Sequence, residues 1–459
     1  MDYSAANHAL WNVIIQMGLI AGAILLANLL RRRVSLIRRS LIPIAVLGGF
    51  LLLIVKLIGL VDLDEELLEM LVYHGIALGF IAMSLRVPSE KDLARKGDLT
   101  GLKSGAVIVS TYMVQGLIGL LITMLLGYTV MPGLFKAAGM LLPMGFGQGP
   151  GQANNVGSSY EALGFAGGRS FGLAIAAAGY LVACVVGVVI LNVLTRRGKV
   201  GKTRSAVDDE PDADFFQSRD EIPVSDSIDK LSVQFAMILL VYLATYLAAW
   251  GLTSGIAALS PGLAKTVNTL IWGFNFIIGS ALAILIRVLL ERGKRSGLIT
   301  RQYQNNYLLN RLSGFFFDVM IVAGIASINL EDIRGLWLPF ILLVIFGAAA
   351  TWIHLSVVCK KVYPDYYYEG LISMFGMLTG TISSGVLLLR EIDPDLATPS
   401  ANNLVIGSSF GIILGAPVLI LVGLAPKSDL FCWMVIGLVL VYLALLYLFM
   451  FKAHRNKKK

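Results

Sequence analysis

The stretch Met144–Ser159 reads MGFGQGPGQANNVGSS, and the stretch Met374–Leu389 reads MFGMLTGTISSGVLLL. Both interrupt apolar surroundings with glycines and small polar residues. Exposed backbone amides and carbonyls are costly in lipid, so non-helical backbone persists at membrane depth only where it lines a protein cavity. Two such interruptions, at corresponding places in the two halves of a chain, are typical of the central binding site of a secondary transporter.

The composition predicts a protein that spans a membrane many times. The chain is 57% hydrophobic and 14% charged, and its mean hydropathy is +0.78, more than a soluble domain can bury. Roughly eleven segments approach the 20 apolar residues that cross the hydrocarbon core. They are expected near 9–30, 41–60, 69–86, 103–130, 170–194, 231–252, 265–290, 311–329, 336–359, 402–424 and 431–451.

The basic residues predict the orientation of these spans. Short loops rich in Lys and Arg stay in the cytoplasm. All the basic clusters, including 31–39 and the tail 452–459, fall on one side if the N-terminus is outside and each segment crosses once. We therefore expect a multi-pass protein of the plasma (inner) membrane with a cytoplasmic C-terminus. The net charge of +8 is then a topology signal and not a sign of nucleic-acid binding. Because Asp2 replaces a basic n-region, no removable signal peptide is expected.

The same count predicts an internal repeat of inverted topology. Residues 1–198 would form five spans with a re-entrant hairpin near 137–160, and residues 229–424 would repeat this plan from the opposite side, with a hairpin near 366–389. The polar stretch 199–228 reads as a cytoplasmic linker. One extra span and a basic tail, 425–459, complete this all-α polytopic fold.

The two hairpins carry groups suited to an anion and to a small cation. Glycine allows sharp turns, and Pro150 breaks the first hairpin. Free amides at a half-helix N-terminus favour a carboxylate, and free carbonyls favour sodium. The candidate substrate ligands in the hairpins are Gln148, Gln152, Asn154 and Asn155 in the first and Thr379, Thr381, Ser383 and Ser384 in the second. The candidate ion ligands in the hairpins are Gly147, Gly149, Gly380 and Thr381.

Two charged residues outside the hairpins are further candidates. Arg169 opens the fifth span, where it could attract or pair an anionic substrate or anchor the helix at the interface. Asp318 lies within the eighth span, and a carboxylate inside a membrane is a functional candidate as an ion ligand. A polar contact near the cytoplasmic edge is the alternative for Asp318.

Several function classes are not supported by the sequence. It contains no GxxxxGK[ST] loop, so we expect transport to be driven by a gradient and not by ATP. The scattered cysteines and histidines show no spacing typical of a transition-metal site, and we expect no cofactor other than a coupling ion. An intramembrane enzyme would need a nucleophile with its base, or a metal triad, and neither is visible.

The chain resembles the bacterial glutamate:sodium symporter family. The resemblance rests on IPIAVLGG (Ile42–Gly49) after a basic SLIRRS, on Ser84-Leu85-Arg86, on the glycines of the first hairpin and on GMLTGTISSG (Gly376–Gly385). It spans roughly residues 1–424. It implies sodium-coupled uptake of an anionic amino acid, most directly glutamate, by a homodimer that works through an elevator-like movement.

Two transport hypotheses remain open. In the first, sodium drives symport of an acidic amino acid or another small carboxylate. In the second, a proton-coupled carrier or exchanger of the same architecture uses a buried carboxylate such as Asp318 as the group that titrates.

Overall fold

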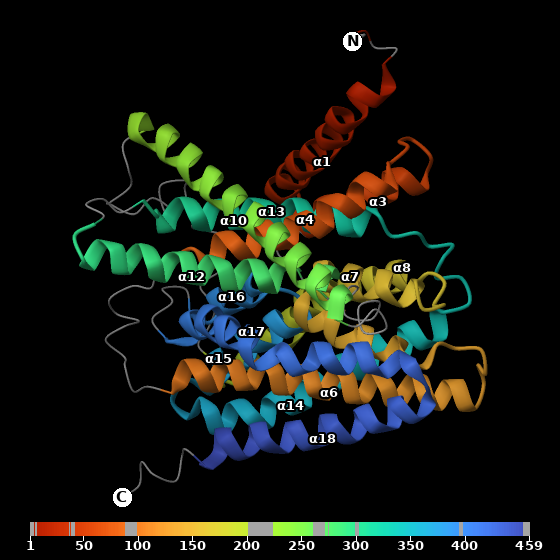
Figure 1. Ribbon diagram of the computed structural model, residues 1–459. Coiled ribbons are helices and arrows are strands. Elements are labelled where there is room, and N and C mark those ends of the chain that lie inside the picture. Colours follow the sequence, from red (N-terminus) through yellow and green to blue (C-terminus); the bar gives the residue numbers. More distant parts are fainter. Residues whose placement is uncertain are drawn as a thin grey trace, which may run out of the picture. The chain divides into compact units, whose positions relative to one another are not determined.

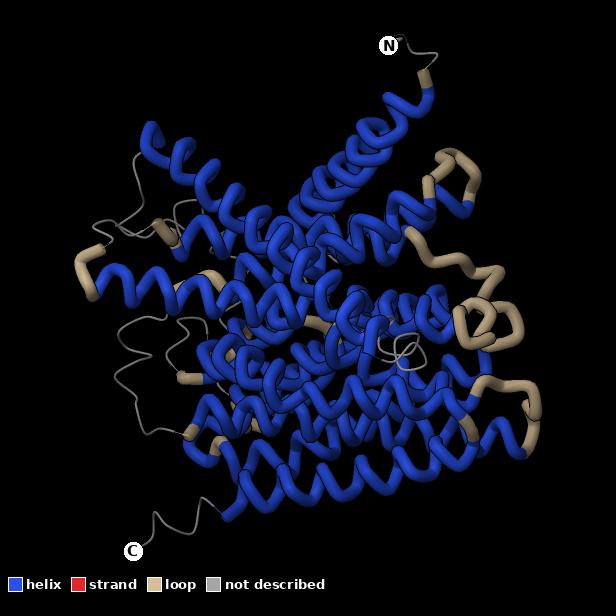
Figure 2. Tube along the Cα trace, in the orientation of Figure 1, coloured by secondary structure: helices blue, strands red, loops and turns tan. Residues whose placement is uncertain are grey.

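The computed structural model describes residues 7–35, 42–87, 99–200, 224–259, 271–273, 275–298, 303–393 and 398–452, together with Ser4 and Ile37. Every regular element in these ranges is helical, as the tube in Figure 2 shows. The long helices are α1 (His8–Arg33), α3 (Ile44–Leu57), α4 (Glu65–Ser84), α6 (Thr100–Tyr128), α8 (Gly168–Leu181), α9 (Gly187–Arg196), α10 (Val224–Leu259), α12 (Asn275–Arg295), α13 (Asn306–Ala326), α14 (Trp337–Val362), α17 (Ser400–Leu424) and α18 (Asp429–Lys452).

Shorter elements lie between them. They are η1 (Lys136–Met140), η2 (Pro143–Gly147), α7 (Pro150–Glu161), η3 (Val182–Val186), η5 (Pro364–Tyr366), α15 (Tyr367–Thr379), α16 (Ile382–Arg390) and η6 (Ala425–Lys427).

Nine described helical segments are long and apolar enough to cross a membrane, which confirms the expected class of multi-pass helical membrane protein. The helix α8, the π-turn η3 and α9 form one of them without interruption. Exposed side chains of α10 are large and apolar, among them Leu240, Leu243 and Trp250. A helix that presents apolar side chains outward is suited to contact lipid.

Two of the eleven expected spans are not among these nine segments. The segment expected at 41–60 is the helix α3, which has only 14 residues. The segment expected at 265–290 is described from 275 as α12, which continues to Arg295 and ends in charged residues. Residues 201–223 of the expected linker lie outside the described part of the chain; α10 begins at Val224, and its membrane-length segment begins at Lys230.

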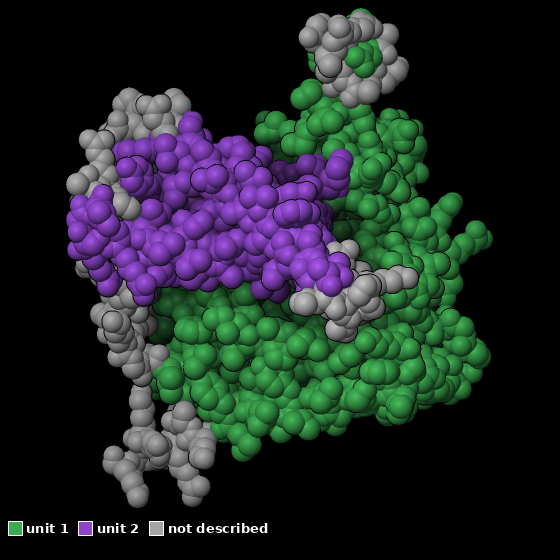
Figure 3. Space-filling model, viewed as in Figure 1, with its two compact units in different colours: residues 1–69, 98–204, 321–459 green, residues 70–97, 205–320 purple. Residues whose placement is uncertain are grey.

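The chain forms two compact units, coloured in Figure 3, and each unit takes residues from both halves of the sequence. Unit 1 comprises Met1–Glu69, Asp98–Arg204 and Ile321–Lys459, and unit 2 comprises Met70–Gly97 and Ser205–Met320. In unit 2, side chains of α4, α10, α12 and α13 form a buried apolar cluster that includes Ile81, Ile238 and Leu309.

In unit 1, the long helix α6 packs against α14, α17 and α18, which run beside it in Figure 1. The extra C-terminal helix α18 therefore packs against this unit through one face and exposes large apolar side chains on the other. Its Tyr447 hydroxyl lies 2.8 Å from His354 Nδ1 on α14, and His354 Nε2 lies 3.1 Å from Ser110 Oγ on α6. Ser110 also donates to the Val107 carbonyl, so its only hydroxyl proton is already used. His354 Nε2 then donates to Ser110, and Tyr447 donates to His354 Nδ1.

Candidate functional site

The first break in helical structure lies at Gln148–Gly149, between η2 and α7. Gly149 has a φ of 86° and a ψ of −175°, a conformation that is open only to glycine. Pro150 then occupies the first turn of α7, where its missing N–H costs nothing and its fixed φ favours the helix. The local sequence thus stops one helix and starts the next within two residues, as the Gly-Pro pattern predicts.

The second break lies at Gly380–Thr381, between α15 and α16. The helix α15 ends at Thr379, Thr381 is extended with a φ of −142°, and α16 begins at Ile382. The helices α15 and α16 pack closely against each other: a Cβ added to Gly376 would lie 2.9 Å from the Gly385 Cα. The two helices have 13 and 9 residues, so each is too short to cross about 30 Å of hydrocarbon.

Both breaks lie against the same short segment of unit 1, where α8 continues into η3. A Cβ at Gly179 would lie 2.3 Å from the Thr379 carbonyl oxygen and 3.0 Å from the Phe146 ring. The next residue is Tyr180, whose hydroxyl lies 3.8 Å from the Cβ position of Gly149 at the first break. The Cβ of Ala183 lies 3.2 Å from the Cβ position of Gly380 at the second break. The helix α15 also contacts both η2 and η3, so the segments that carry the two breaks pack together in unit 1.

The π-helical turn η3 occurs at this point in an otherwise α-helical span. Such turns insert an extra residue into the helix and are frequent at functional sites. Here the π turn begins one residue before Ala183, which contacts the second break.

Gln115 of α6 contacts both breaks from another side. Its Nε2 donates to the Leu378 carbonyl, at 2.8 Å, and to Thr351 Oγ1, at 2.9 Å. Its Oε1 lies 3.0 Å from the Cβ position of Gly147, just before the first break. A side chain at Gly147 would also collide with the Tyr112 ring, 2.4 Å away. Only glycine fits here, because α6 approaches η2 so closely.

Several polar atoms around the breaks are buried and have no hydrogen-bond partner among the described residues. A buried polar group without a partner destabilises a fold by about 1–3 kcal/mol, so such groups are rare unless a ligand or water satisfies them. At the breaks they are both amide atoms of Gln152, Asn154 Oδ1, Ser384 Oγ and Gln115 Oε1. Their side chains are at most 4% exposed. Three of these four residues are candidates from the sequence.

The other hairpin candidates have more ordinary surroundings. Asn155 is buried, and Gln148 is partly exposed beside Gly149. The Thr379 hydroxyl donates to the Phe375 carbonyl within its own helix, at 2.8 Å. Thr381 makes no side-chain cap bond to α16. The side chain of Ser383 lies outside the described residues.

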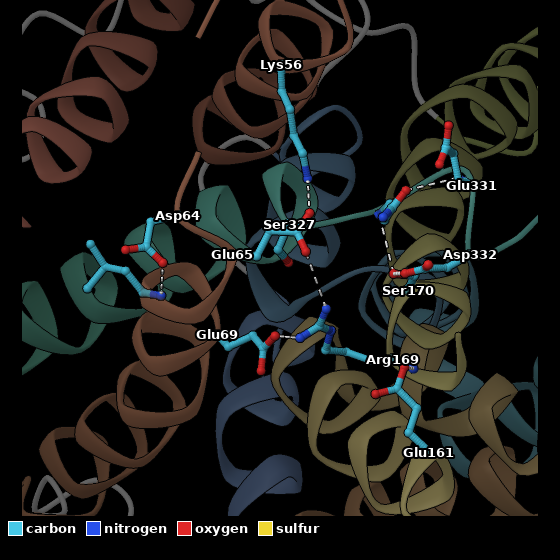
Figure 4. A network of polar contacts seen from close by, with 12 residues as sticks. Lys56, Asp64, Glu65, Glu69, Glu161, Arg169, Ser170, Ser327, Glu331 and Asp332 are labelled. Atoms are coloured by element: carbon cyan, nitrogen blue, oxygen red, sulfur yellow. Dashed lines mark hydrogen bonds and ion pairs between the residues drawn. The ribbon is translucent and has the colours of Figure 1, made fainter. Parts of the chain in front are cut away.

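Arg169 faces carboxylates of unit 1 (Figure 4). Its guanidinium contacts Glu69 and lies 3.9 Å from Glu65, which also pairs with Lys56 at 2.8 Å. Its backbone N–H donates to Glu161, at 2.9 Å, and burial raises the pKa of that carboxyl. Arg169 precedes Gly179 by ten residues, or about 15 Å of helix axis. The structure therefore places Arg169 in an ion-pair network and does not bring it to the breaks.

Replacing Arg169 tests this structural role. We expect Arg169→Met to lower the stability of the folded protein by about 1–2 kcal/mol, because Glu69 would lose its cation and Glu65 would keep only Lys56, while both carboxylates remain partly solvated. Thermal unfolding in detergent measures this change, and Arg169→Lys should recover part of it. A raised KM for uptake at unchanged stability would instead favour a substrate contact.

Asp318 belongs to unit 2, where its side chain is exposed on α13. Its expected role as an ion ligand stays a prediction. No cluster of three or more His, Cys, Asp or Glu side chains suited to a metal ion occurs within the described ranges.

Gln115 and Gly179 are the residues that the sequence interpretation missed. Both lie in the interior of expected spans, where a glutamine is an unusual residue and a glycine is a common one. The glutamine could have been noticed, because polar side chains inside membrane helices are often functional. The role of Gly179 depends on partners distant in sequence.

No protein-family model matches the chain, and no curated protein is significantly similar to it in sequence.

Proposed function

We propose that this protein is a secondary active transporter, in which sodium entry drives uptake of a small anionic substrate held at the two breaks. An acidic amino acid such as glutamate is the first candidate, in agreement with the family resemblance. The observation that carries the proposal is the set of buried polar atoms without partners at the breaks, on Gln115, Gln152, Asn154 and Ser384. Such atoms are rare in a folded protein unless a ligand or water satisfies them, and their grouping at the two breaks favours a ligand there.

The helix ends at the breaks support an anionic substrate. The N-caps of α7 and α16 are Gly149 and Thr381, and neither supplies a side-chain cap bond. The first N–H groups of both helices are thus available to an anion, which the helix dipole also favours. Amide groups of Gln152 and Asn154 can donate to carboxylate oxygens or accept from an ammonium group.

The proposed transport cycle follows from the arrangement of elements. The order of five helical segments with a short helix pair before the fifth occurs once in α1–α9 and again in α10–α17. We interpret this as an inverted repeat whose short pairs are re-entrant, with the N-terminus outside and the C-terminus in the cytoplasm. Both breaks belong to unit 1, which supports an elevator-like movement that carries the ligand with one body. A homodimer in the plasma membrane remains part of the proposal.

Uptake into proteoliposomes tests the function. Purified protein is supplied with labelled glutamate or other carboxylates under an inward sodium gradient or an inward proton gradient alone. We expect accumulation with sodium. Accumulation driven by protons alone would favour the proton-coupled alternative, and accumulation that needs neither gradient would exclude both forms of coupling.

A single substitution tests the assignment of the first hairpin. We expect Asn154→Ala to reduce uptake about tenfold or more, because a buried amide that binds a charged ligand is worth about 1.5–3 kcal/mol. Ser159→Ala is the matched control on α7, since the Ser159 hydroxyl donates to the Asn155 carbonyl within the helix. Equal uptake by both variants would show that Asn154 belongs to the scaffold.

A further inference from the structure

The orientation of the Gln115 amide is determined by its two partners. Thr351 Oγ1 donates its only proton to the Gly347 carbonyl, at 2.7 Å, and so acts as an acceptor toward Gln115. The Leu378 carbonyl can only accept. Both hydrogens on Gln115 Nε2 are therefore used, and an exchange of its nitrogen and oxygen would lose both bonds.

This orientation directs Gln115 Oε1 toward the breaks. The side chain is fully buried, and within the described residues its oxygen has no donor. It lies 3.0 Å from the Cβ position of Gly147, where the Tyr112 ring also packs and only glycine fits. A buried carbonyl-type oxygen in this position requires a hydrogen-bond donor or a cation.

A second oxygen without a partner lies at the second break, which Gln115 reaches through its bond to the Leu378 carbonyl. Ser384 is 2% exposed, and its Oγ is 2.9 Å from the Cβ position of Gly380. Like Gln115 Oε1, Ser384 Oγ has no partner in the described chain. The carbonyl end of α15 adjoins both side chains and carries the negative end of the helix dipole. Amide, hydroxyl and backbone carbonyl oxygens together suit a small, hard cation.

We propose that Gln115 Oε1 and Ser384 Oγ are ligands of a sodium ion held at the carbonyl end of α15. This inference rests on the proposed function and refines it. The cation is placed at the second break, and the first break with Gln152 and Asn154 is left to the substrate. A substrate ammonium group is the competing occupant, because it would satisfy the same oxygens.

Thermal unfolding of the purified full-length protein, without substrate, tests the assignment. Sodium chloride is titrated against choline chloride at constant ionic strength. We expect the wild-type melting temperature to rise with sodium. In Ser384→Ala, we expect the half-maximal sodium concentration to rise about tenfold, because an oxygen ligand to a charge is lost. The variant should fold, since the hydroxyl has no partner among the described residues.

Gln115→Leu and Gln234→Leu form a second, matched pair. We expect Gln115→Leu to lose the sodium response and also to melt earlier, because two internal hydrogen bonds are removed. Gln234, in unit 2, donates to the Tyr303 carbonyl and accepts from the Asn305 N–H. Its substitution should lower the melting temperature and leave the sodium response unchanged. If Gln115→Leu yields no folded protein, Ser384→Ala decides alone.

The outcomes separate this inference from the proposed function. An unchanged sodium response in Ser384→Ala and in folded Gln115→Leu overturns the sodium site but leaves sodium-driven uptake intact. A wild-type protein stabilised by glutamate alone and indifferent to sodium overturns the site in favour of the ammonium group. Sodium-independent stability together with sodium-independent uptake overturns both proposals.

Discussion

Gly139→Ala is expected to prevent accumulation of stably folded protein. A Cβ at Gly139 would lie 2.2 Å from the carbonyl carbon and oxygen of Gly119, and a Cβ at Gly119 would lie 2.0 Å from the Gly139 oxygen. The two backbones are thus in direct contact, with no flexible side chain that could move away. Overpacking in a core costs about 1–3 kcal/mol, and a collision with backbone lies at or above the upper end.

The contact matters because it positions the first break. The Thr123 hydroxyl on α6 donates to the Lys136 carbonyl, at 2.6 Å, so η1 is fixed at its beginning as well as at Gly139. The chain then passes through η2 to Gly149. Displacement of η1 from α6 would move Gly147 away from Gln115 and separate the groups that form the site.

Size-exclusion profiles and melting temperatures in detergent measure the effect. Gly133→Ala is the matched control, because it precedes the same element and a Cβ there meets nothing within 4 Å. It should change stability by less than about 0.5 kcal/mol. Wild-type stability of Gly139→Ala would show that α6 and η1 are not packed backbone to backbone.

The break beside Pro150 was predicted from the local sequence, whereas for the second hairpin the sequence indicated only the range 366–389 and not the break at Gly380–Thr381. The Gly149-Pro150 pair and the Gly380-Thr381 pair act within a few residues of chain, through backbone conformation alone. The apolar segments were predicted for the same reason, since length and hydropathy are local properties. The short α3 and the charged end of α12 were misjudged because composition does not specify where a helix stops.

The partners across the site could not be predicted in this way. Gln115 of α6 donates to the Leu378 carbonyl of α15, which lies 263 residues later in the chain. Gly179 of α8 leaves room for the Thr379 carbonyl, which belongs to the same helix α15. Arg169 was a candidate for binding the substrate because an arginine at the start of a span can attract an anion. Its partners Glu65 and Glu69 lie about 100 residues earlier, and only the packing of α4 and α8 reveals them.

Gln152→Leu is expected to increase the stability of the ligand-free protein while it reduces uptake by at least about tenfold. Gln152 is 2% exposed, and neither amide atom has a partner among the described residues. Leucine has a similar volume and removes a buried polar group that costs about 1–3 kcal/mol when it is not satisfied. The substrate would lose one or two hydrogen bonds to a charged group, each worth about 1.5–3 kcal/mol.

The opposite signs distinguish a ligand-binding residue from a structural one. Gln234 is also buried, at 1% exposed, but both ends of its amide are bonded within the protein. Gln234→Leu should therefore lower the melting temperature and leave uptake per folded molecule unchanged. A residue kept for ligand binding destabilises the empty protein, because its polar atoms are satisfied only in the complex. If Gln152→Leu melts earlier than the wild type, as Gln234→Leu should, Gln152 serves the fold and the first break does not bind the substrate.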